Sequence, residues 1–576
     1  MSTDDSTEDS TYALSPCALC QFDVVSGDDI LVGTILFHRR LRWNPDDKEA
    51  QRILKESIDN SVCKATRWPG LGGFRCYHAG CLDMADPEDE VQLLRFVEAM
   101  KYRRQPTLLQ KEVRRQQLMG RLSTELLTHF ALQGTHLPLE LWHKIAEHML
   151  PHYAAANARS LWKRPKPTPV HLAKDIWCEY VELEGIRYVA RLSNTPFVGW
   201  ELIYRPSGET IQYIFTGENH LGVMRVLFST GSNVPQVDEA PGIWWRTVNI
   251  EDGNVALRPR SDGIKLRNFS DLPRSRVAWS IPMPHEMRLE CLTVHRAEQY
   301  PPYMSSLVCN QPSVTGYSVL WAGRLVTIHA HRGIQDWSCY QSAATTGTWL
   351  HMPVDPGEVI TEIWHRLDYP PRQRALGFKT SLGRVFIAGV YCDYLYSRPR
   401  WWSLLDRPGQ TRMFFEDSDE EITVLAFEGP RPMGPNLAFP PHLPSAEPPI
   451  YPHLEEYFYF DHRLTGLERV TPCKVGNRPG FTGLMLHFAN GHRESVGQVR
   501  LDCLCAPIPL QDSASWYLAF KKGDDGESSY LAAITATSPS PDADFEKVLP
   551  LSFRGRLEWF WSSRRCYVIH DETQLE

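Results

Sequence analysis

The feature that most restricts the fold is a strand–turn–strand pattern that recurs beyond residue 180. Four stretches combine β-branched and aromatic residues with Gly or Asn-Gly, where a hairpin turn needs a positive φ. They are residues 222–237, 316–330, 376–390 and 483–499. Their separations of 94, 61 and 106 residues disfavour a propeller with equal blades, counted from Gly222, Gly316, Gly377 and Gly483. The sequence therefore predicts a large, mainly antiparallel β region that is sandwich-like or prism-like.

Composition agrees with a β-rich chain that contains several domains. The 43 Pro and 18 Trp among 576 residues favour short strands and irregular connections over long helices. A net charge of -8 gives no electrostatic footprint for nucleic acid, which argues against a nucleic-acid partner. The N-terminus lacks the apolar core of a secretory signal, and no apolar run approaches the roughly 18 residues of a membrane span. We therefore expect no membrane partner and a cytoplasmic or nuclear location.

The pattern along the chain predicts an α+β multidomain protein. Two amphipathic helices are expected at 88–104 and 107–132, separated at Pro106. Nine prolines in the 23 residues from Pro430 to Pro452 exclude a central strand there. The predicted segments are an acidic disordered tail (1–13), a Cys/His module (14–88), a helical region (89–180), a β-rich domain (181–429), a proline-rich linker or long loop (430–452) and a second β-rich module (453–576).

Two short Cys/His pairs lie on either side of a gap of 57 residues. The segment CALC supplies Cys17 and Cys20, and YHAGC supplies His78 and Cys81. Three thiolates and one imidazole form a Cys₃His set, which zinc favours in closed structural sites. The strand-like residues in the gap can form a hairpin that brings the two pairs together. We predict a structural zinc ion on these four residues. The rival ligands are Cys63 and Cys76, and the alternative is four unrelated reduced thiols.

An amphipathic helix is predicted to begin near Leu137. Pro138 suits the first turn of a helix, and apolar residues then recur four positions apart. This stripe consists of Leu137, Leu141, Ile145 and Met149. Trp142 and Leu150 widen the stripe to a face that one small helix cannot bury alone. The face needs a partner, in this chain or in another.

The opening Leu-Pro-x-Glu-Leu of this helix resembles the F-box family. The residues that carry the resemblance are Leu137, Pro138, Glu140 and Leu141. It extends over about residues 135–178, with Leu161, Trp162, Ile176 and Trp177 as possible counterparts of the second half, which departs from the family pattern. In that family the segment binds a Skp1-type adaptor joined to a cullin scaffold, and the rest of the chain captures the ubiquitylation target.

The resemblance implies the adaptor contacts and the partners of this chain. The implied adaptor-binding residues are Leu137, Pro138, Glu140, Leu141, Trp142, Ile145 and Met149. The order of a Cys/His module, a basic helical stretch, an F-box and Trp-rich β structure is similar to fungal F-box proteins. The segment MPVDPGEVITEIWHRL (352–367) is similar to that group and faintly to jacalin-like β-prism lectins. These similarities imply a substrate-recruiting subunit of a ubiquitin ligase, whose target protein is unknown.

The sequence offers no catalytic constellation, so we expect no enzymatic activity. It has no GxSxG elbow, no P-loop and no dinucleotide-binding glycine motif. His329 and His331 alternate on a predicted strand as two metal ligands could, but no Asp, Glu or third His lies close by in sequence, so we interpret them as a satisfied or exposed strand face. Two alternatives to the adaptor function stay open. One is a carbohydrate-binding or general interaction β protein without a ligase role, and the other is an enzyme with an unrecognised site.

Two further groups of residues are candidate contact surfaces. A basic stretch could bind nucleic acid or an acidic protein, although such a run is usually the solvated face of a helix. Its members are Lys101, Arg103, Arg104, Lys111, Arg114, Arg115 and Arg121. The pairs Trp244–Trp245 and Trp401–Trp402 could anchor a partner, but tryptophans in β structure are more often core residues.

Overall fold

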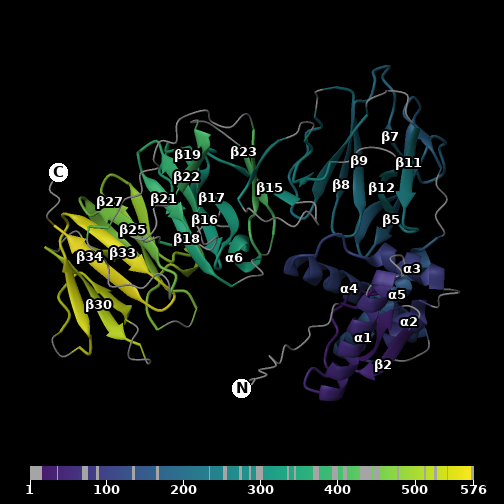
Figure 1. Cartoon of the computed structure of the whole chain (residues 1–576), viewed down its shortest axis with the longest axis horizontal. Coiled ribbons are helices and arrows are strands. Elements are labelled where there is room, and N and C mark those ends of the chain that lie inside the picture. The colour runs from purple at the N-terminus through teal and green to yellow at the C-terminus, as the bar shows by residue number, and fades with distance from the viewer. Residues whose placement is uncertain are drawn as a thin grey trace, which may run out of the picture. The chain divides into compact units, whose positions relative to one another are not determined.

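The computed structural model describes two compact units of the chain, Met1–Pro284 and His285–Glu576 (Figure 1). The described residues are 16–572 without 35–36, 68–74, 86–89, 133–136, 164–167, 232–233, 251–255, 271–274, 284–286, 293–302, 334–336, 343–345, 368–374, 392–399, 407–411, 419, 429–443, 446–454, 477–478, 511–513, 524–528 and 541–542. The predicted tail (1–13) and most of the predicted linker (430–452) lie outside them. The chain is mostly β, with a Cys/His cluster near its start.

The first unit begins with a small α/β module. Strand β1 (Asp29–Thr34) lies between β2 (Phe37–Arg42) and β3 (Arg75–His78), and both pairings are antiparallel. The predicted hairpin is therefore present as β1 and β2. Helix α1 (Lys48–Arg67) was not anticipated from the sequence, although Ala50, Leu54 and Ser57 are buried at helical spacing. Helix α2 (Ala79–Ala85) follows β3 directly.

Three longer helices follow the module and lie together in the purple-to-blue part of Figure 1. They are α3 (Glu90–Met100), α4 (Leu108–Leu132) and α5 (Leu139–Leu161). The break between α3 and α4 includes Pro106, as the sequence predicted. Helix α5 packs against α2 and α4, and it continues through Pro151 to Leu161. The cores of the module and the helices meet at Cys17, Cys20 and Cys81, which belong to the same apolar cluster as residues of α3, α4 and α5.

The rest of the first unit consists of short antiparallel strands. Their pairings are β6–β5–β7, β9–β8–β10–β13 and β12–β11–β4. The strands are β4 (Val170–His171), β5 (Ile176–Leu183), β6 (Ile186–Ser193), β7 (Glu201–Tyr204), β8 (Tyr213–Glu218), β9 (Val223–Ser229), β10 (Trp244–Asn249), β11 (Ala256–Ser261), β12 (Leu266–Ser270) and β13 (Ala278–Trp279). This β part therefore begins at Val170, inside the region 89–180 that was predicted to be helical.

The second unit is built from small antiparallel sheets. Their strand orders are β14–β24–β23–β15, β17–β16–β18, β21–β20–β19–β22, β28–β27–β26–β29, β25–β33–β34 and β31–β30–β32. The elements up to the proline-rich stretch are β14 (Arg288–Cys291), β15 (Tyr303–Val308), β16 (Val314–Trp321), β17 (Leu325–Arg332), α6 (Ser338–Ser342), β18 (Thr348–Pro353), β19 (Ile360–Leu367), β20 (Ala375–Thr380), β21 (Val385–Ala388), β22 (Arg400–Asp406), β23 (Arg412–Glu416) and β24 (Val424–Phe427).

The elements after the proline-rich stretch share their core with those before it. They are β25 (Phe458–Arg463), β26 (Leu467–Cys473), β27 (Gly483–Phe488), β28 (Arg493–Gly497), the 3₁₀ turn η2 (Leu501–Cys503), β29 (Ile508–Pro509), β30 (Trp516–Lys522), β31 (Ser529–Thr535), β32 (Lys547–Leu551), β33 (Arg556–Trp561) and β34 (Cys566–Asp571). One apolar cluster joins Phe415 and Leu425 to Phe458 and Trp559. A linker or long loop between two β modules was predicted at 430–452, whereas the contacts divide the chain near residue 284.

Three of the four predicted hairpins are confirmed. They are β16–β17, β20–β21 and β27–β28, with Gly323, Gly383 and Gly491 at positive φ in their turns. The prediction for 222–237 was wrong, because β9 pairs backward with β8. The turn of that hairpin contains Asn219, whose side-chain oxygen accepts hydrogen bonds from the backbone N–H groups of Leu221 and Gly222. Gly222 therefore ends the turn and does not begin a new hairpin.

A buried ion pair in the first unit connects α4 to the β5–β6 turn and to the loop that carries Cys17 and Cys20. The Arg114 guanidinium donates to both Glu184 carboxylate oxygens at 2.5 and 2.6 Å. It also donates to the backbone oxygen of Cys20 at 2.5 Å. Arg114 is 7% exposed and Glu184 is 3% exposed. Glu184 has a φ of 53° in the β5–β6 turn, so the pair fixes the turn, the helix and the Cys17–Cys20 loop together.

Other members of the basic stretch also contact acidic or aromatic side chains of this unit. Arg103, Lys111, Arg115 and Arg121 form ion pairs with Glu218, Asp23, Glu147 and Glu182. The guanidinium of Arg104 lies 5.0 Å from the Trp244 ring. The side chains of these five basic residues are therefore engaged in contacts within the first unit. Trp244, Trp245 and Trp401 are buried, as expected for core tryptophans.

Replacing Arg114 by methionine is expected to destabilise the first unit by about 3–5 kcal/mol, because the Glu184 carboxylate is left buried without its cation. Adding Glu184→Gln should restore part of that loss, since the remaining side chain is neutral. The measurement is denaturant unfolding followed by tryptophan fluorescence. The control is Arg39→Met, which removes a solvent-exposed pair with Glu56 and should change stability little. Equal effects of the Arg114 and Arg39 variants would contradict the structural role of this pair.

Candidate functional site

The structure brings the four predicted ligands together in the first unit. Cys17 and Cys20 lie on a tight turn, in which the Gln21 N–H donates to the Cys17 oxygen at 2.8 Å. His78 is the last residue of β3, and Cys81 lies in α2. The Ala18 N–H donates to the backbone oxygen of Cys76 at 2.9 Å, which holds the turn beside β3. Antiparallel pairing of β1 with β3 thus closes the gap of 57 residues.

The donor atoms are spaced as a single metal ion would require. All four lie within 4.8 Å of one another. The Nδ1 atom of His78 is 3.3 Å from the Cys20 sulfur and 3.7 Å from the Cys81 sulfur. Two donors of a tetrahedral zinc ion, with bonds of about 2.0–2.3 Å, are separated by roughly 3.5 Å. The four residues are buried, so the arrangement is a closed cluster that can hold a metal ion.

The surroundings of the cluster favour a deprotonated thiol and a fixed imidazole. Burial alone raises the pKa of Cys17, but hydrogen bonds from Cys20, Cys81 and His78 outweigh it and hold this pKa well below its usual value. The backbone N–H of His78 points to the Cys17 sulfur at 3.3 Å. On its other side, His78 Nε2 lies 3.3 Å from a carboxylate oxygen of Asp28. Such a carboxylate orients a metal-binding histidine and selects its tautomer.

The rival ligand Cys76 lies outside this cluster. It pairs with Val32 across β1 and β3, and it packs with Ile30, Trp43 and Leu54 in the core of the module. Burial raises the pKa of its thiol to about 12, as expected for an inert core cysteine. The side chain of Cys63, the other rival, lies outside the described residues. Sequence reasoning missed Asp28, because its role depends on the Nε2 side of a histidine 50 positions away.

Helix α5 exposes most of the predicted adaptor-binding stripe. Leu137 is 38% exposed, Leu141 44% and Met149 43%, while Ile145 is partly buried. Pro138 caps the start of the helix, and both Pro138 and Glu140 are exposed. Neighbouring Leu139 adds a further exposed apolar side chain. The helix thus presents an apolar stripe, bordered by exposed polar residues, that the described part of its own unit does not bury.

The opposite face of α5 is the one that packs inside the unit. Its buried residues are Trp142, Ala146, Leu150, Ala154, Ala155 and Ala158. Small alanines allow the helix to approach α2 and α4 closely. Trp142 is 3% exposed, and its ring stacks on Phe130 of α4 at a centroid distance of 5.1 Å. Trp142 was included among the predicted adaptor contacts, but the structure places it on this inner face.

The second half of the F-box-like segment is helical only as far as Leu161, and its last described residues lie in strands. Leu161 ends α5, and buried Trp162 donates its indole N–H to the backbone oxygen of Asp262 at 3.0 Å. Ile176 and Trp177 begin β5. These residues therefore join the helical part of the unit to its β part.

The second unit contains a polar cavity of about 780 Å³. Its lining combines the charged side chains of Arg384, Asp461 and Glu494 with the aromatic rings of Phe386 and Tyr459. The lining residues come from β18, β21, β25, β27, β28, β33 and the loops beside them, so no short sequence motif marks the cavity. The volume of this cavity and its mixed charged and aromatic lining suit a small polar ligand or a peptide side chain.

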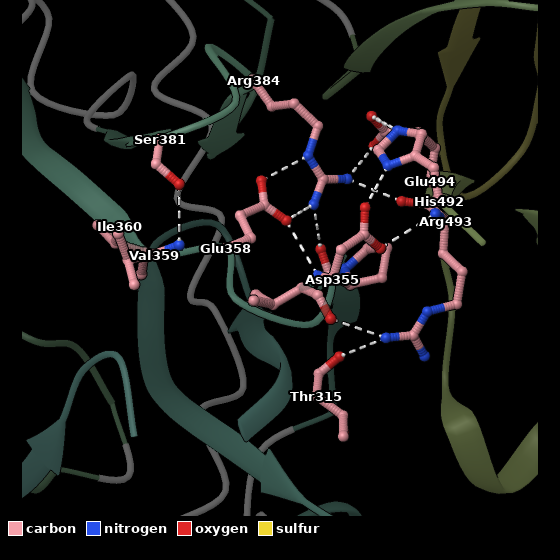
Figure 2. A network of polar contacts seen from close by, with 12 residues as sticks. Thr315, Asp355, Glu358, Val359, Ile360, Ser381, Arg384, His492, Arg493 and Glu494 are labelled. Atoms are coloured by element: carbon pink, nitrogen blue, oxygen red, sulfur yellow. Dashed lines mark hydrogen bonds and ion pairs between the residues drawn. The ribbon is translucent and has the colours of Figure 1, made fainter. Parts of the chain in front are cut away.

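Three charged or polar residues of the lining, Arg384, His492 and Glu494, belong to a network that continues to Asp355 and Glu358 (Figure 2). His492 bonds to Asp355 through Nδ1, and its Nε2 lies 2.9 Å from a Glu494 oxygen. The Glu494 carboxylate also pairs with Arg384 at 3.1 Å, and Arg384 donates to Glu358 at 2.7 Å. The hydrogen bond with Glu494 is the main cause of a raised pKa of His492. The hydrogen bond with Asp355 raises this pKa further, whereas burial lowers it. Burial opposes ionisation of Glu494, but His462, His492 and Arg384 lower its pKa to about 2.

Comparison of the chain with protein-family models finds no match, and neither does comparison with curated proteins. None of the described helices has the length and apolar character needed to cross a membrane.

The double variant Cys17→Ser, Cys20→Ser is expected to lose one equivalent of tightly bound transition metal per chain, because it removes two of four donors. Asp28→Asn should keep the ion but bind it about 10–100-fold more weakly, since the imidazole loses its orienting carboxylate. Elemental analysis and chelator competition on the purified chain measure both effects. Cys291→Ser, at an exposed cysteine, is the control. Equal metal content in the double variant and the wild type would contradict the ligand set.

The His492 network predicts a pH dependence of the second unit. Because the folded-state pKa of His492 is raised, its contribution to stability is present below the unfolded value of about 6.5 and is lost as the pH rises through the raised value. Thermal unfolding between about pH 6 and pH 9 should show this loss in the wild type and a flatter profile in His492→Gln. The same slope in both proteins would show that His492 is not a charged bridge between Asp355 and Glu494.

Proposed function

We propose that this chain is a substrate-recruiting subunit of a Skp1–cullin-type ubiquitin ligase. The first unit binds a Skp1-type adaptor through α5, and the second unit binds the target protein. Ubiquitin transfer itself is carried out by other subunits, so the chain acts as an adaptor and not as an enzyme. The Leu137–Leu141 opening supports the partner class, by its resemblance to the F-box family.

The observation that carries the proposal is an exposed apolar stripe on α5, opposite the face that the helix buries. The inner face, with Trp142 and Leu150, is buried against the chain's own helices. On the outer side, Leu141 is 44% and Met149 43% exposed, and Leu137, which lies just before the helix, is 38% exposed. A helix that served only as internal packing would keep its second face polar. The exposed stripe has the spacing of anchors that enter a groove on a partner.

The Cys/His cluster serves a structural role in this proposal. We assign zinc to it, because three thiolates and an imidazole are the donor set that this ion prefers, and four protein donors leave no position for water. The cluster fixes α2 and the Cys17–Cys20 turn, and α2 packs on α5. Zinc binding therefore supports the helix that carries the docking face. Loss of the metal should weaken adaptor binding indirectly.

The second unit offers the surface for a target. Its cavity is concave, and charged groups on its wall are already held in place by one another. Fixed charges favour specific recognition, because they lose little freedom when a partner binds. The identity of the target does not follow from these groups.

The direct test is binding of the purified chain to a Skp1-type adaptor, measured by calorimetry. Leu141→Glu should weaken binding about 10-fold or more, because an apolar anchor worth at least 1.5 kcal/mol or so is replaced by a charge. Glutamate keeps a helix propensity close to that of leucine, so α5 should remain folded. Circular dichroism and metal content check that it does.

The matched control is Val198→Glu, which places the same charge on another exposed apolar residue of the first unit. It should bind the adaptor as the wild type does. No binding by the wild type, or equal weakening by both variants, would overturn the adaptor function. The remaining alternative would then be an interaction or carbohydrate-binding β protein without a ligase role.

A further inference from the structure

Two histidines of β17 meet a cysteine of α6 in the second unit. His329 and His331 are two positions apart, so their side chains leave the same face of the strand. Their ring centroids are 4.7 Å apart, at an interplanar angle of 71°. Cys339 lies in α6, eight positions after His331. One donor atom from each of these residues lies within 4.8 Å of the other two.

The three donors form a set that suits a transition-metal ion. Imidazole nitrogen and thiolate sulfur are the ligands that Zn²⁺ and Cu²⁺ prefer over oxygen. The two histidines alone did not indicate a site, because a strand face often carries such a pair. The fold supplies the missing donor by returning the chain after β17 into the short helix α6. A small adjustment brings donors within 4.8 Å to the roughly 3.5 Å that a tetrahedral ion requires.

A buried hydroxyl network fixes the His331 ring. The Ser318 hydroxyl lies 2.8 Å from His331 Nε2 and 2.9 Å from His351 Nδ1. The Tyr340 hydroxyl lies 3.2 Å from the Ser318 oxygen and accepts the Leu501 N–H at 3.2 Å. Ser318, His351 and Tyr340 are at most 5% exposed. Groups of this kind orient metal-binding histidines in proteins.

The same network fixes the third donor. Tyr340 follows Cys339 directly in α6, and its ring packs edge-on against Trp349 at 4.9 Å. Anchoring Tyr340 from both ends restricts the backbone that carries Cys339. The Arg500 guanidinium, 4.9 Å from the Tyr340 ring, is paired with Asp502 at 2.7 Å.

This group differs from the cluster of the first unit in exposure and in number of donors. Cys17, Cys20, His78 and Cys81 are all buried, whereas His329 and Cys339 are partly exposed. Among the described residues, the second group has three donors in place of four. Three protein donors and access to solvent are the features of sites that exchange a fourth ligand.

We propose that His329, His331 and Cys339 form a second metal site, which binds a zinc-class transition-metal ion and leaves its fourth position to water or a small ligand. Ser318 acts as a positioning residue for His331. The site is independent of the proposed adaptor function, because it involves no residue of α5 or of the first unit.

The test uses the metal-free full-length chain, titrated with Zn²⁺ and separately with Co²⁺. The wild type should bind two equivalents that survive gel filtration. Cys339→Ser and His329→Gln should each bind one equivalent, and Cys17→Ser, Cys20→Ser should retain the other. Cobalt reports the type of site, since thiolate-to-cobalt absorption should be weaker for one thiolate than for three. Ser318→Ala should weaken the second equivalent about 10–100-fold without removing it.

The control is Cys505→Ser, at an exposed cysteine of the same unit. It should bind two equivalents, as the wild type does. Cys339 and His329 are partly exposed, so their conservative variants should fold, and circular dichroism checks this. The proposal would be overturned if Cys339→Ser and His329→Gln each still bound two equivalents of metal. It would also be overturned if the wild type bound a single equivalent that was lost in the Cys17→Ser, Cys20→Ser variant.

Discussion

The ion pair between Arg114 and Glu184 is the interaction on which the first unit depends most. It is buried, and it reaches three parts of the chain at once: α4, the β5–β6 turn and the backbone of Cys20. Desolvating two charges is costly, so such a pair stabilises a fold only when its geometry and further hydrogen bonds compensate. Here both carboxylate oxygens are bonded, and Arg114 Nη2, which bonds one of them, also donates to the loop that carries two metal ligands.

This arrangement connects the metal cluster to the exposed helix. The Cys17–Cys20 turn is held from one side by Arg114 and from the other by β3. His78 and Cys81 then position α2, and α2 packs on α5 together with α4. Helix α5 is thereby supported along its inner face and leaves its outer face to solvent. The proposed docking face of α5 stays in place because the opposite face of the helix packs on α2 and α4.

Much of this organisation could be predicted from the sequence, because it depends on local patterns. The hairpin turns at Gly383 and Gly491 follow from turn chemistry, and the break between α3 and α4 contains a proline. The four ligands of the first cluster were recognisable because each pair lies on a short motif. The stripe of α5 was recognisable from its spacing of four.

The rest depends on contacts between residues far apart in sequence. Asp28 reaches the metal cluster only through the Nε2 atom of His78, and Glu184 becomes the partner of Arg114 only after β5 and β6 form. Trp142 belongs to the apolar face by periodicity, but which side of a two-sided helix is buried depends on Phe130. Cys339 joins His329 and His331 because α6 returns to β17. No spacing rule links these residues.

The central claim is that the outer face of α5 is a docking surface. Hydroxyl-radical footprinting of Met149 and Leu141, in the free chain and with a Skp1-type adaptor, tests it most directly. The account predicts that both side chains are oxidised in the free chain and protected in the complex, while exposed Val198 reacts equally in both. Protection of Met149 and Leu141 in the free chain, or unchanged oxidation after the adaptor is added, would contradict it.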